Sequence, residues 1–334
     1  MILAGDVGGT KTRLALFAAA TGFAAPLAEA TFASRDYAGL EPILHEFLSV
    51  LDWPVDHAGL GVAGPVAGGR AAVTNLPWVV DEANLAETFG FRQVLVMNDL
   101  EAIAAAVPAL GARDLYTLNH GCVSKEGAMA VIAPGTGLGE AYLAWDGTRY
   151  RVHPSEGGHA DFAPLDAPQA GLLLHLMKRF DHVSYERVCS GMGLPNIYAF
   201  LRDSGVAEEA GWLRPRLEAA ADPVPLMIAA ALDEERPCAL CRAVLETFVS
   251  ILGAAAGNTA LKFLATGGVF LGGGIPPRIL TALDSGRFME AFTRKGRMSG
   301  LMEKIPVHVI LNPKAALVGA ARQVMARGGA PKGS

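Results

Sequence analysis

The chain has 334 residues, of which 51% are hydrophobic and 18% are charged, and its formal net charge is −5. This length exceeds the usual size of one hydrophobic core, so we expect two domains or one large α/β domain. The acidic net charge and the absence of long blocks of like charge argue against nucleic acid and against an anionic membrane as partners.

A glycine-rich segment near the N-terminus is the first motif. Residues 2–4 and 12–17 predict two strands, and Gly5-Asp6-Val7-Gly8-Gly9-Thr10 connects them as a hairpin turn. Glycines allow the backbone to lie against an anion, Thr10 can contact phosphate, and Asp6 can hold a cation or its water shell. By composition alone, an ordinary glycine hairpin is the favoured interpretation. The segment is not a P-loop, because no Gly-Lys-Ser/Thr follows and no helix opens here.

A second glycine pattern follows a predicted strand over residues 57–63. Its spelling, Gly59-x-Gly61-x-x-Gly64, matches the dinucleotide-binding fingerprint. That fingerprint must open a helix, whereas Gly64 leads into more glycines and a strand-like segment at 70–74. We therefore interpret the match as chance or as close backbone packing.

An apolar run ends abruptly at Asn98 and Asp99. Residues 94–97 predict a short buried strand, and the alanine-rich residues from Leu100 onward predict a helix. The pair therefore lies at a strand's carboxyl end, the edge where open α/β sheets bind ligands. A carboxylate there can accept a proton from a hydroxyl, and the amide can donate and accept hydrogen bonds, which suits a polyol. A helix cap is an equally good interpretation of Asp99.

The hairpin pattern is repeated in the second part of the chain. Residues 128–133 and 140–145 predict two strands, and Pro134-Gly135-Thr136-Gly137-Leu138-Gly139 connects them. Two such loops, one in each half of the chain, can close on a polyphosphate from both sides. Their backbone N–H groups and threonine hydroxyls would stabilise the charge that develops in phosphoryl transfer.

Charged residues then occur in loops. Glu156 and His159 flank a glycine pair, and Glu-x-x-His is a metal signature only on a helix, which this pair disfavours. We expect these side chains to hydrogen-bond a small ligand directly, with a plain surface loop as the alternative. Glu186 precedes a Ser-Gly-x-Gly turn, although a solvated charge on a helix is the commoner role of a glutamate.

A triple glycine marks the last motif. Residues 263–271 predict a strand, and Gly272-Gly273-Gly274-Ile275 carries it into a helix. A flat ring can lie against such a backbone, so a nucleoside site is plausible, and a flexible corner is the alternative. A strand at 307–311, a helix at 314–325 and a loose tail at 328–334 complete the chain.

The cysteines indicate a reducing compartment. Four of them, irregularly spaced, are too few for a disulfide framework, and Cys238 and Cys241 form a lone CxxC without a second pair or neighbouring histidines. We interpret this CxxC as structural or incidental thiols rather than zinc ligands. No signal peptide precedes Asp6, and the uncharged run at 247–261 is too short to cross a bilayer. We expect a cytoplasmic protein.

Taken together and in order, five motifs resemble the bacterial glucokinase family. They cover almost the whole chain: 5–10, 98–99, 134–139, 156–162 and 272–275. The chain resembles the group without the zinc-binding cysteine cluster of the related repressor/open-reading-frame/kinase sugar kinases. The resemblance implies an α/β two-domain sugar kinase fold of the actin-like ATPase (ribonuclease H-like) type. Its small α/β domain would contain residues 1–110 and 300–334, its large α+β domain residues 111–299, and the cleft between them the active site.

The resemblance also implies a role for each motif. Asp99 is the expected base, and the expected sugar-binding residues are Asn98, Asp99, Glu156, His159 and Glu186. The residues expected to contact ATP are Gly5, Asp6, Val7, Gly8, Gly9, Thr10, Gly135, Thr136, Gly137, Gly272, Gly273 and Gly274. The expected reaction transfers the γ-phosphate of ATP to the 6-hydroxyl of glucose, with Asp6 holding Mg²⁺ through water, in a homodimer.

Three alternatives remain open at this point. A sugar-sensing repressor on the same scaffold would need a DNA-binding helix pair before the first strand, and that strand begins at Ile2. An NAD-dependent oxidoreductase would rest on the glycine pattern at 59–64. Among kinases, another hexose or an acylated amino sugar can replace glucose, and polyphosphate or ADP can replace ATP.

Overall fold

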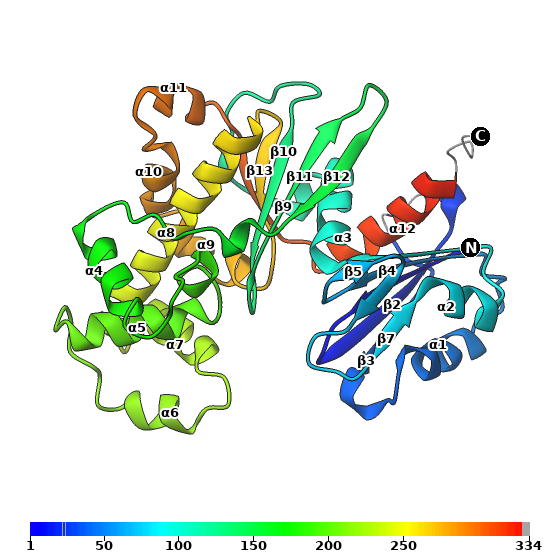
Figure 1. Ribbon diagram of the computed structural model, residues 1–334, viewed down its shortest axis with the longest axis horizontal. Helices are drawn as coiled ribbons and strands as arrows, with labels where there is room; N and C mark the ends of the chain where they lie inside the picture. The colour runs from blue at the N-terminus through cyan, green and yellow to red at the C-terminus, as the bar shows by residue number, and fades with distance from the viewer. Residues whose placement is uncertain (22, 24, 329–334) are drawn as a thin grey trace. The chain divides into compact units, whose positions relative to one another are not determined.

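The computed structural model describes residues 1–21, 23 and 25–328, which divide into two compact units (Figure 1). Unit 1 contains residues 1–114, 148–154 and the chain from Asn312 onward, and unit 2 contains residues 115–147 and 155–311. Most of the predicted tail, residues 329–334, lies outside the described residues. The predicted small and large domains, with their boundaries at 110 and 300, stay a prediction; in the structure residues 300–311 belong to unit 2.

A five-stranded sheet forms the middle layer of unit 1, in the order β3-β2-β1-β4-β8. The first three strands are antiparallel neighbours, and β4 and β8 run parallel to β1. Their bounds are β1 (Ile2–Val7), β2 (Lys11–Phe17), β3 (Ala28–Ala33), β4 (His57–Val62) and β8 (Gln93–Asn98). This mixed sheet carries both parallel and antiparallel pairs.

Helices cover both faces of this sheet (Figure 1). Because side chains alternate along a strand, Leu3 and Val7 of β1 pack with one pair of helices while Ile2 and Ala4 pack with the other. The helices beside Leu3 and Val7 are α1 (Leu40–Ser49) and α2 (Glu82–Phe89), and those beside Ile2 and Ala4 are α3 (Asp99–Ala106) and α12 (Ala315–Gly328). The alternation places Asp6 on the same face as α3.

The first predicted turn is shorter in the structure than in the sequence analysis. Strand β1 continues through Gly5, Asp6 and Val7, because these residues pair with β2 on one side and with β4 on the other. Only residues 8–10 remain as the turn between β1 and β2. Gly5 therefore lies at a crowded position inside β1, and the loop begins only after Val7.

The dinucleotide-like glycines lie where other backbone segments approach β4 closely. A Cβ atom on Gly59 would collide with the Ala320 carbonyl of α12, and one on Gly61 would lie 2.9 Å from the Cβ of Ala102 in α3. The chain then enters a small three-stranded sheet rather than a helix: β5 (Val66–Ala67), β6 (Arg70–Ala72) and β7 (Val79–Asp81). The interpretation as close backbone packing is confirmed.

Unit 2 is built on strands in the order β11-β10-β13-β14-β9. Their bounds are β9 (Leu115–Asn119), β10 (Met129–Pro134), β11 (Leu138–Trp145), β13 (Gly268–Leu271) and β14 (Val307–Ile310). Strand β9 was not predicted, because all five of its residues are half-buried and show no alternation. Strand β13 begins later than predicted, since the preceding helix continues to Phe263.

The long helix α8 (Ala239–Phe263) is the centre of the unit 2 core (Figure 1). Among the described residues it is the one helix long and apolar enough to cross a membrane, and 67% of its apolar window is buried inside the protein. That burial identifies it as a core helix. Cys238 and Cys241 lie buried at its start, where the Cys238 sulfur accepts the Cys241 N–H, so these thiols have a structural role.

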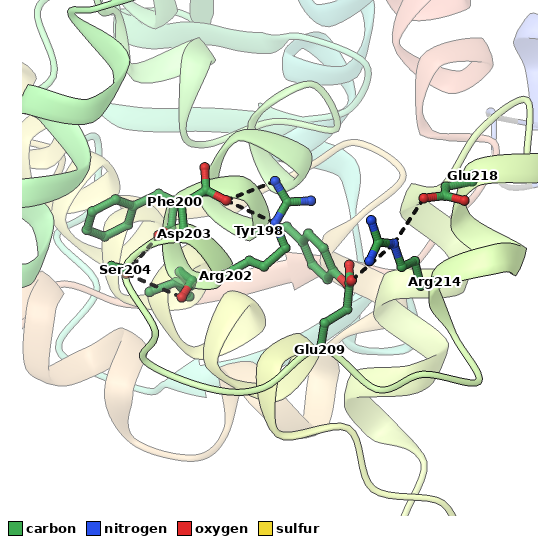
Figure 2. A network of polar contacts seen from close by, with 9 residues as sticks. Tyr198, Phe200, Arg202, Asp203, Ser204, Glu209, Arg214 and Glu218 are labelled. Carbon is green, nitrogen blue, oxygen red and sulfur yellow. Dashed lines mark hydrogen bonds and ion pairs between the residues drawn. The ribbon is translucent and has the colours of Figure 1, made fainter.

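The remaining elements complete the two units. A polar network ties α5 to the loop before α6, in which Tyr198 donates to Glu209 at 2.8 Å and Arg214 pairs with Glu209 and Glu218 (Figure 2). The bounds not yet given are β12 (Tyr150–Ser155), α4 (Ala167–Leu176), α5 (Gly193–Asp203), α6 (Arg214–Ala219), α7 (Val224–Leu232), α9 (Leu280–Leu283), α10 (Arg287–Thr293) and α11 (Ser299–Met302). Each charged group drawn in this network has a partner, which indicates a stabilising role.

Candidate active site

The junction between β8 and α3 carries the predicted base. Asn98 ends β8 and occupies the N-cap position of α3, where its Oδ1 accepts the Leu100 N–H at 3.0 Å and its Nδ2 donates to the Gly64 carbonyl at 3.0 Å. Asp99 Oδ1 accepts the same N–H at 2.8 Å. The cap position that we considered for Asp99 therefore belongs to Asn98, and Asp99 is the first residue of the helix.

Asp6 lies close enough to Asp99 for their charges to interact. Gly61 pairs with Asp6 in the sheet, and a Cβ atom on Gly61 would lie 3.5 Å from the Asp99 Cα, so the missing side chain makes room for α3. Burial and, to a smaller extent, the Asp99 charge raise the pKa of Asp6 to about 6, and Arg13 opposes both. Burial also raises the pKa of Asp99, against the hydrogen bond from Leu100. The pair is poised to gain a proton or a cation.

Ser34 fixes the turn at residues 8–10. Its buried hydroxyl donates to the Gly8 carbonyl at 2.7 Å and lies 3.0 Å from the Thr12 hydroxyl, while its N–H donates to the Thr10 carbonyl at 3.1 Å. A Cβ atom on Gly9 would lie 2.6 Å from the Thr74 carbonyl oxygen. The turn conformation is thus set by Ser34 and Thr74, which are far away in the sequence. No sequence motif around Ser34 predicts this role.

In unit 2, the turn between β10 and β11 meets Glu186. The Gly135 carbonyl accepts the Gly191 N–H at 2.7 Å, and Glu186 Oε2 accepts the Leu138 N–H at 2.9 Å. A Cβ atom on Gly137 would collide with that same carboxylate oxygen. Gly137 is therefore the residue that lets the half-buried Glu186 reach the turn.

The triple glycine packs against the same turn from another side. Gly272 N–H donates to the Ile132 carbonyl of β10 at 2.9 Å, which continues the parallel pairing of β13 with β10. Gly273 has φ +80°, and a Cβ atom there would lie 2.5 Å from the Pro134 carbonyl oxygen. Both the positive φ and the close approach require glycine. The two glycine motifs expected to contact ATP in unit 2 thus lie side by side.

Glu156 and His159 lie on a short loop beside β11. The loop forms one 3-10 turn over Gly157–His159, although we expected the glycine pair to disfavour a helix, and a Cβ atom on Gly158 would collide with the Leu138 carbonyl. Glu156 Oε2 and His159 Nε2 are 3.9 Å apart, and their side chains are 90% and 62% exposed. The structure brings this pair to the strand that also contacts Glu186.

One buried residue near this loop was missed in the sequence. Glu140 lies in β11 and is 4% exposed, and burial raises the pKa of its carboxyl group. An acidic residue between buried apolar positions of a strand was the available signal. We interpreted residues 140–145 only as a strand, because strand periodicity does not show what a side chain contacts.

Comparison with known proteins agrees with this arrangement. A family model described as Glucokinase matches residues 3–327. The chain is 38% identical to a glucokinase of Nostoc punctiforme, over 96% of this chain and 98% of that protein, and 38% identical to one of Caulobacter vibrioides, over 96% and 93%.

Solved structures show the same fold. A glucokinase from an Antarctic psychrotroph superposes with a TM-score of 0.83 at 33% identity, over 97% of this chain and 98% of that chain. A ROK family glucokinase from Streptomyces griseus, solved with glucose and AMPPNP, gives a TM-score of 0.65 at 20% identity and shows the fold alone. The expected actin-like ATPase fold is confirmed. The chain belongs to the glucokinase family and is an ATP-dependent hexose kinase.

Proposed function

We propose that the protein transfers the γ-phosphate of ATP to the 6-hydroxyl of glucose, which gives glucose 6-phosphate and ADP. The observation that carries this proposal is the half-buried Asp99 at the carboxyl end of β8, where burial raises its pKa. A carboxylate with a raised pKa is a stronger base for a sugar hydroxyl. Family membership and the glucokinases that are 38% identical to this chain support the choice of sugar.

In the proposed mechanism, Asp99 accepts the proton of the 6-hydroxyl as its oxygen attacks the γ-phosphorus. The bond between that phosphorus and the oxygen of ADP breaks as the new bond forms. Asn98, Glu156, His159 and Glu186 orient the sugar, and such positioning supplies a large part of the rate in phosphoryl transfer.

The glycine segments have a second role in this proposal. Backbone N–H groups of Gly9, Thr10, Thr136 and Gly137, with the hydroxyls of Thr10 and Thr136, would stabilise negative charge on the phosphates. The Gly8 and Gly135 N–H groups donate within their own turns, to the Lys11 and Gly137 carbonyls. The residues at 272–274 accept the nucleoside. The positive φ of Gly273 and its contact with the end of β10 support this assignment, since they place bare backbone next to the phosphate turn.

We further propose that Mg²⁺ accompanies ATP and that Asp6 holds it through water. The carboxylate of Asp6 is a hard oxygen donor of the kind that Mg²⁺ prefers, and the nearby negative charge of Asp99 would further favour a cation at Asp6. When bound, the ion neutralises charge on the phosphates. Among the described residues no group of three or more metal-binding side chains occurs, which is compatible with an ion held largely by phosphate and water.

A coupled assay of ADP release, over a panel of hexoses and phosphoryl donors, tests the proposal. We expect glucose with Mg-ATP to give the highest kcat/KM, and we expect EDTA to abolish turnover. Higher activity with an acylated amino sugar, or with polyphosphate or ADP as donor, would contradict the assignment of substrate or donor.

Location, assembly and pathway are also proposals. We propose a cytoplasmic homodimer that delivers glucose into glycolysis, on the basis of the family resemblance. Light scattering coupled to gel filtration is expected to give twice the mass of one chain. A monomer mass at micromolar concentration would contradict the dimer.

A further inference from the structure

Glu140 is a buried carboxylate in the core of unit 2. It lies in β11 close to Leu138, Ala141 and Leu143, which are all buried, and only 4% of its surface is exposed. Burying a carboxylate costs free energy unless hydrogen bonds or charges compensate. An apolar residue would serve a purely structural strand position better, so the contacts of this carboxylate point to a more specific role.

The first contact of Glu140 is with α8. The Thr259 hydroxyl donates to Glu140 Oε2 at 3.2 Å, and the same hydroxyl lies 3.1 Å from the Ala255 carbonyl. One hydroxyl has one proton, so it divides this proton between the carboxylate and the helix. The carboxylate is therefore hydrogen-bonded to α8 through this shared donor, and the positive charge of Lys262 on the same helix also favours its ionised form.

The second contact is with the loop that carries Glu156 and His159. A Cβ atom on Gly157 would collide with Glu140 Oε2, so this oxygen lies directly against the Gly157 backbone. The Ser155 hydroxyl accepts the Gly157 N–H at 3.0 Å from another side. Glu140 thus fills the space beneath the loop at Gly157, the residue that follows Glu156.

The neighbouring residue of α8 supports the other sugar-binding segment. Asn258 donates to the Tyr185 hydroxyl at 2.8 Å, and Tyr185 immediately precedes Glu186. Lys295 in turn donates to Asn258 Oδ1 at 2.7 Å. Two consecutive residues of one core helix, Asn258 and Thr259, therefore support the two segments that carry Glu156, His159 and Glu186.

We propose that Glu140 is a positioning residue for sugar binding. Anchored by Thr259, it holds the Gly157 backbone in place and so orients Glu156 and His159 toward the sugar. This inference rests on the proposed function of that loop. It assigns Glu140 no part in proton or phosphoryl transfer, so its removal should weaken sugar binding more than it slows turnover.

Kinetics of three variants test the inference. We expect Glu140→Ala to raise the KM for glucose about 10-fold, with kcat and the KM for ATP changed less than about 3-fold, because the lost contact orients only the sugar. Glu140→Gln keeps the shape and should restore a KM within about 3-fold of wild type. Thr259→Val, which removes the shared donor, should raise the KM for glucose in the same direction by a smaller factor.

Thr247 offers a matched control on the same helix. Its hydroxyl bonds to the Ala243 carbonyl at 2.8 Å, four residues back like the bond of Thr259 to Ala255, and Glu140 is not its partner. Thr247→Val should leave the KM for glucose unchanged. If Glu140→Ala does not fold, as judged by circular dichroism, Glu140→Gln and Thr259→Val against this control decide the question.

The outcomes separate this inference from the proposed function. Folded Glu140→Ala with an unchanged KM for glucose, or with equal increases in the KM for glucose and for ATP, would overturn the positioning role. An equal effect of Thr259→Val and Thr247→Val would do the same. Failure of the wild-type protein to phosphorylate any hexose would instead reject the proposed function.

Discussion

The carboxylates of Asp6 and Asp99 in unit 1 and that of Glu156 in unit 2 occupy opposite environments. Asp6 and Asp99 in unit 1 are half-buried, interact through their charges and have raised pKa values, whereas Glu156 in unit 2 has a 90% exposed side chain. Perturbed pKa values accompany chemistry, because a base must hold and release a proton. Exposed side chains suit recognition of a polar ligand, and their accuracy then depends on the loop beneath them. Under the proposed function, the half-buried Asp99 suits proton transfer and the exposed Glu156 suits recognition of the sugar.

The largest effect is expected at the base. Asp99→Asn keeps the side-chain shape and should lower kcat by a factor on the order of 10³, since general base catalysis contributes about 10² to 10⁴. Glucose binding, measured by calorimetry, should stay within about 3-fold of wild type if the loss is confined to the reaction step. Near-normal turnover would assign the proton transfer to another group and remove the contrast between the units.

Substitutions in the exposed loop should act on binding. Glu156→Ala and His159→Ala are each expected to raise the KM for glucose by about 10-fold to 100-fold, which is the loss of one or two hydrogen bonds to a ligand. Their melting temperatures should match wild type, because exposed side chains contribute little to stability. A fall in kcat as large as that of Asp99→Asn, with an unchanged KM, would show that Glu156 or His159 acts in the reaction step and not in sugar binding.

A pair of glycine substitutions tests how tightly unit 2 is built. In Gly137→Ala the new methyl group would meet the Glu186 carboxylate, whereas nothing lies within 4 Å of a Cβ atom on Gly135. We expect Gly137→Ala to lower kcat/KM by about 10-fold, because Glu186 must leave the Leu138 N–H. Gly135→Ala is the control and should lose less activity in the same assay. Equal losses would contradict a specific role for the contact with Glu186.

The smallest effect concerns the stability cost of the unit 1 pair. Because the pKa of Asp6 is raised from 3.8 to about 6, its favourable contribution to folding is complete below pH 3.8 and is lost as the pH rises through about 6. Asp6→Asn should therefore be more stable than wild type at pH 8, by on the order of 1 kcal/mol after solvent screening. Below pH 4 the difference should vanish.

Urea unfolding of both proteins at pH 4 and pH 8 measures this difference. Asp52, which is exposed, provides the control variant Asp52→Asn, whose stability relative to wild type should not depend on pH in this way. A wild-type protein more stable than Asp6→Asn at pH 8 would show that the ionised carboxylate is compensated in the folded state. The ionised Asp6 would then carry no stability cost that distinguishes it from the exposed Glu156 and His159 of unit 2.

Local patterns predicted the elements that carry the candidate residues. The strand ending at Asn98, the helix after it and the hairpin at Gly135 all appear, because each depends on neighbours in the sequence. The residues that hold the candidate loops in place, Ser34 and Glu140, could not be predicted from local patterns. Ser34 contacts residues 22 to 26 positions away. Glu140 contacts the Gly157 backbone in the next loop and Thr259, which is 119 positions away. No periodicity in the sequence records such pairings.

The packing of α12 has a consequence for biosynthesis. This helix covers Ile2 and Ala4 of the first strand, and a Cβ atom on Gly319 would collide with the Ala102 carbonyl of α3. Residues 315–328 leave the ribosome after all of unit 2, so until then α3 is the only one of the two helices that can cover this face of the first strand. Unit 1, which contains the first strand, is therefore completed only after all of unit 2 has been translated.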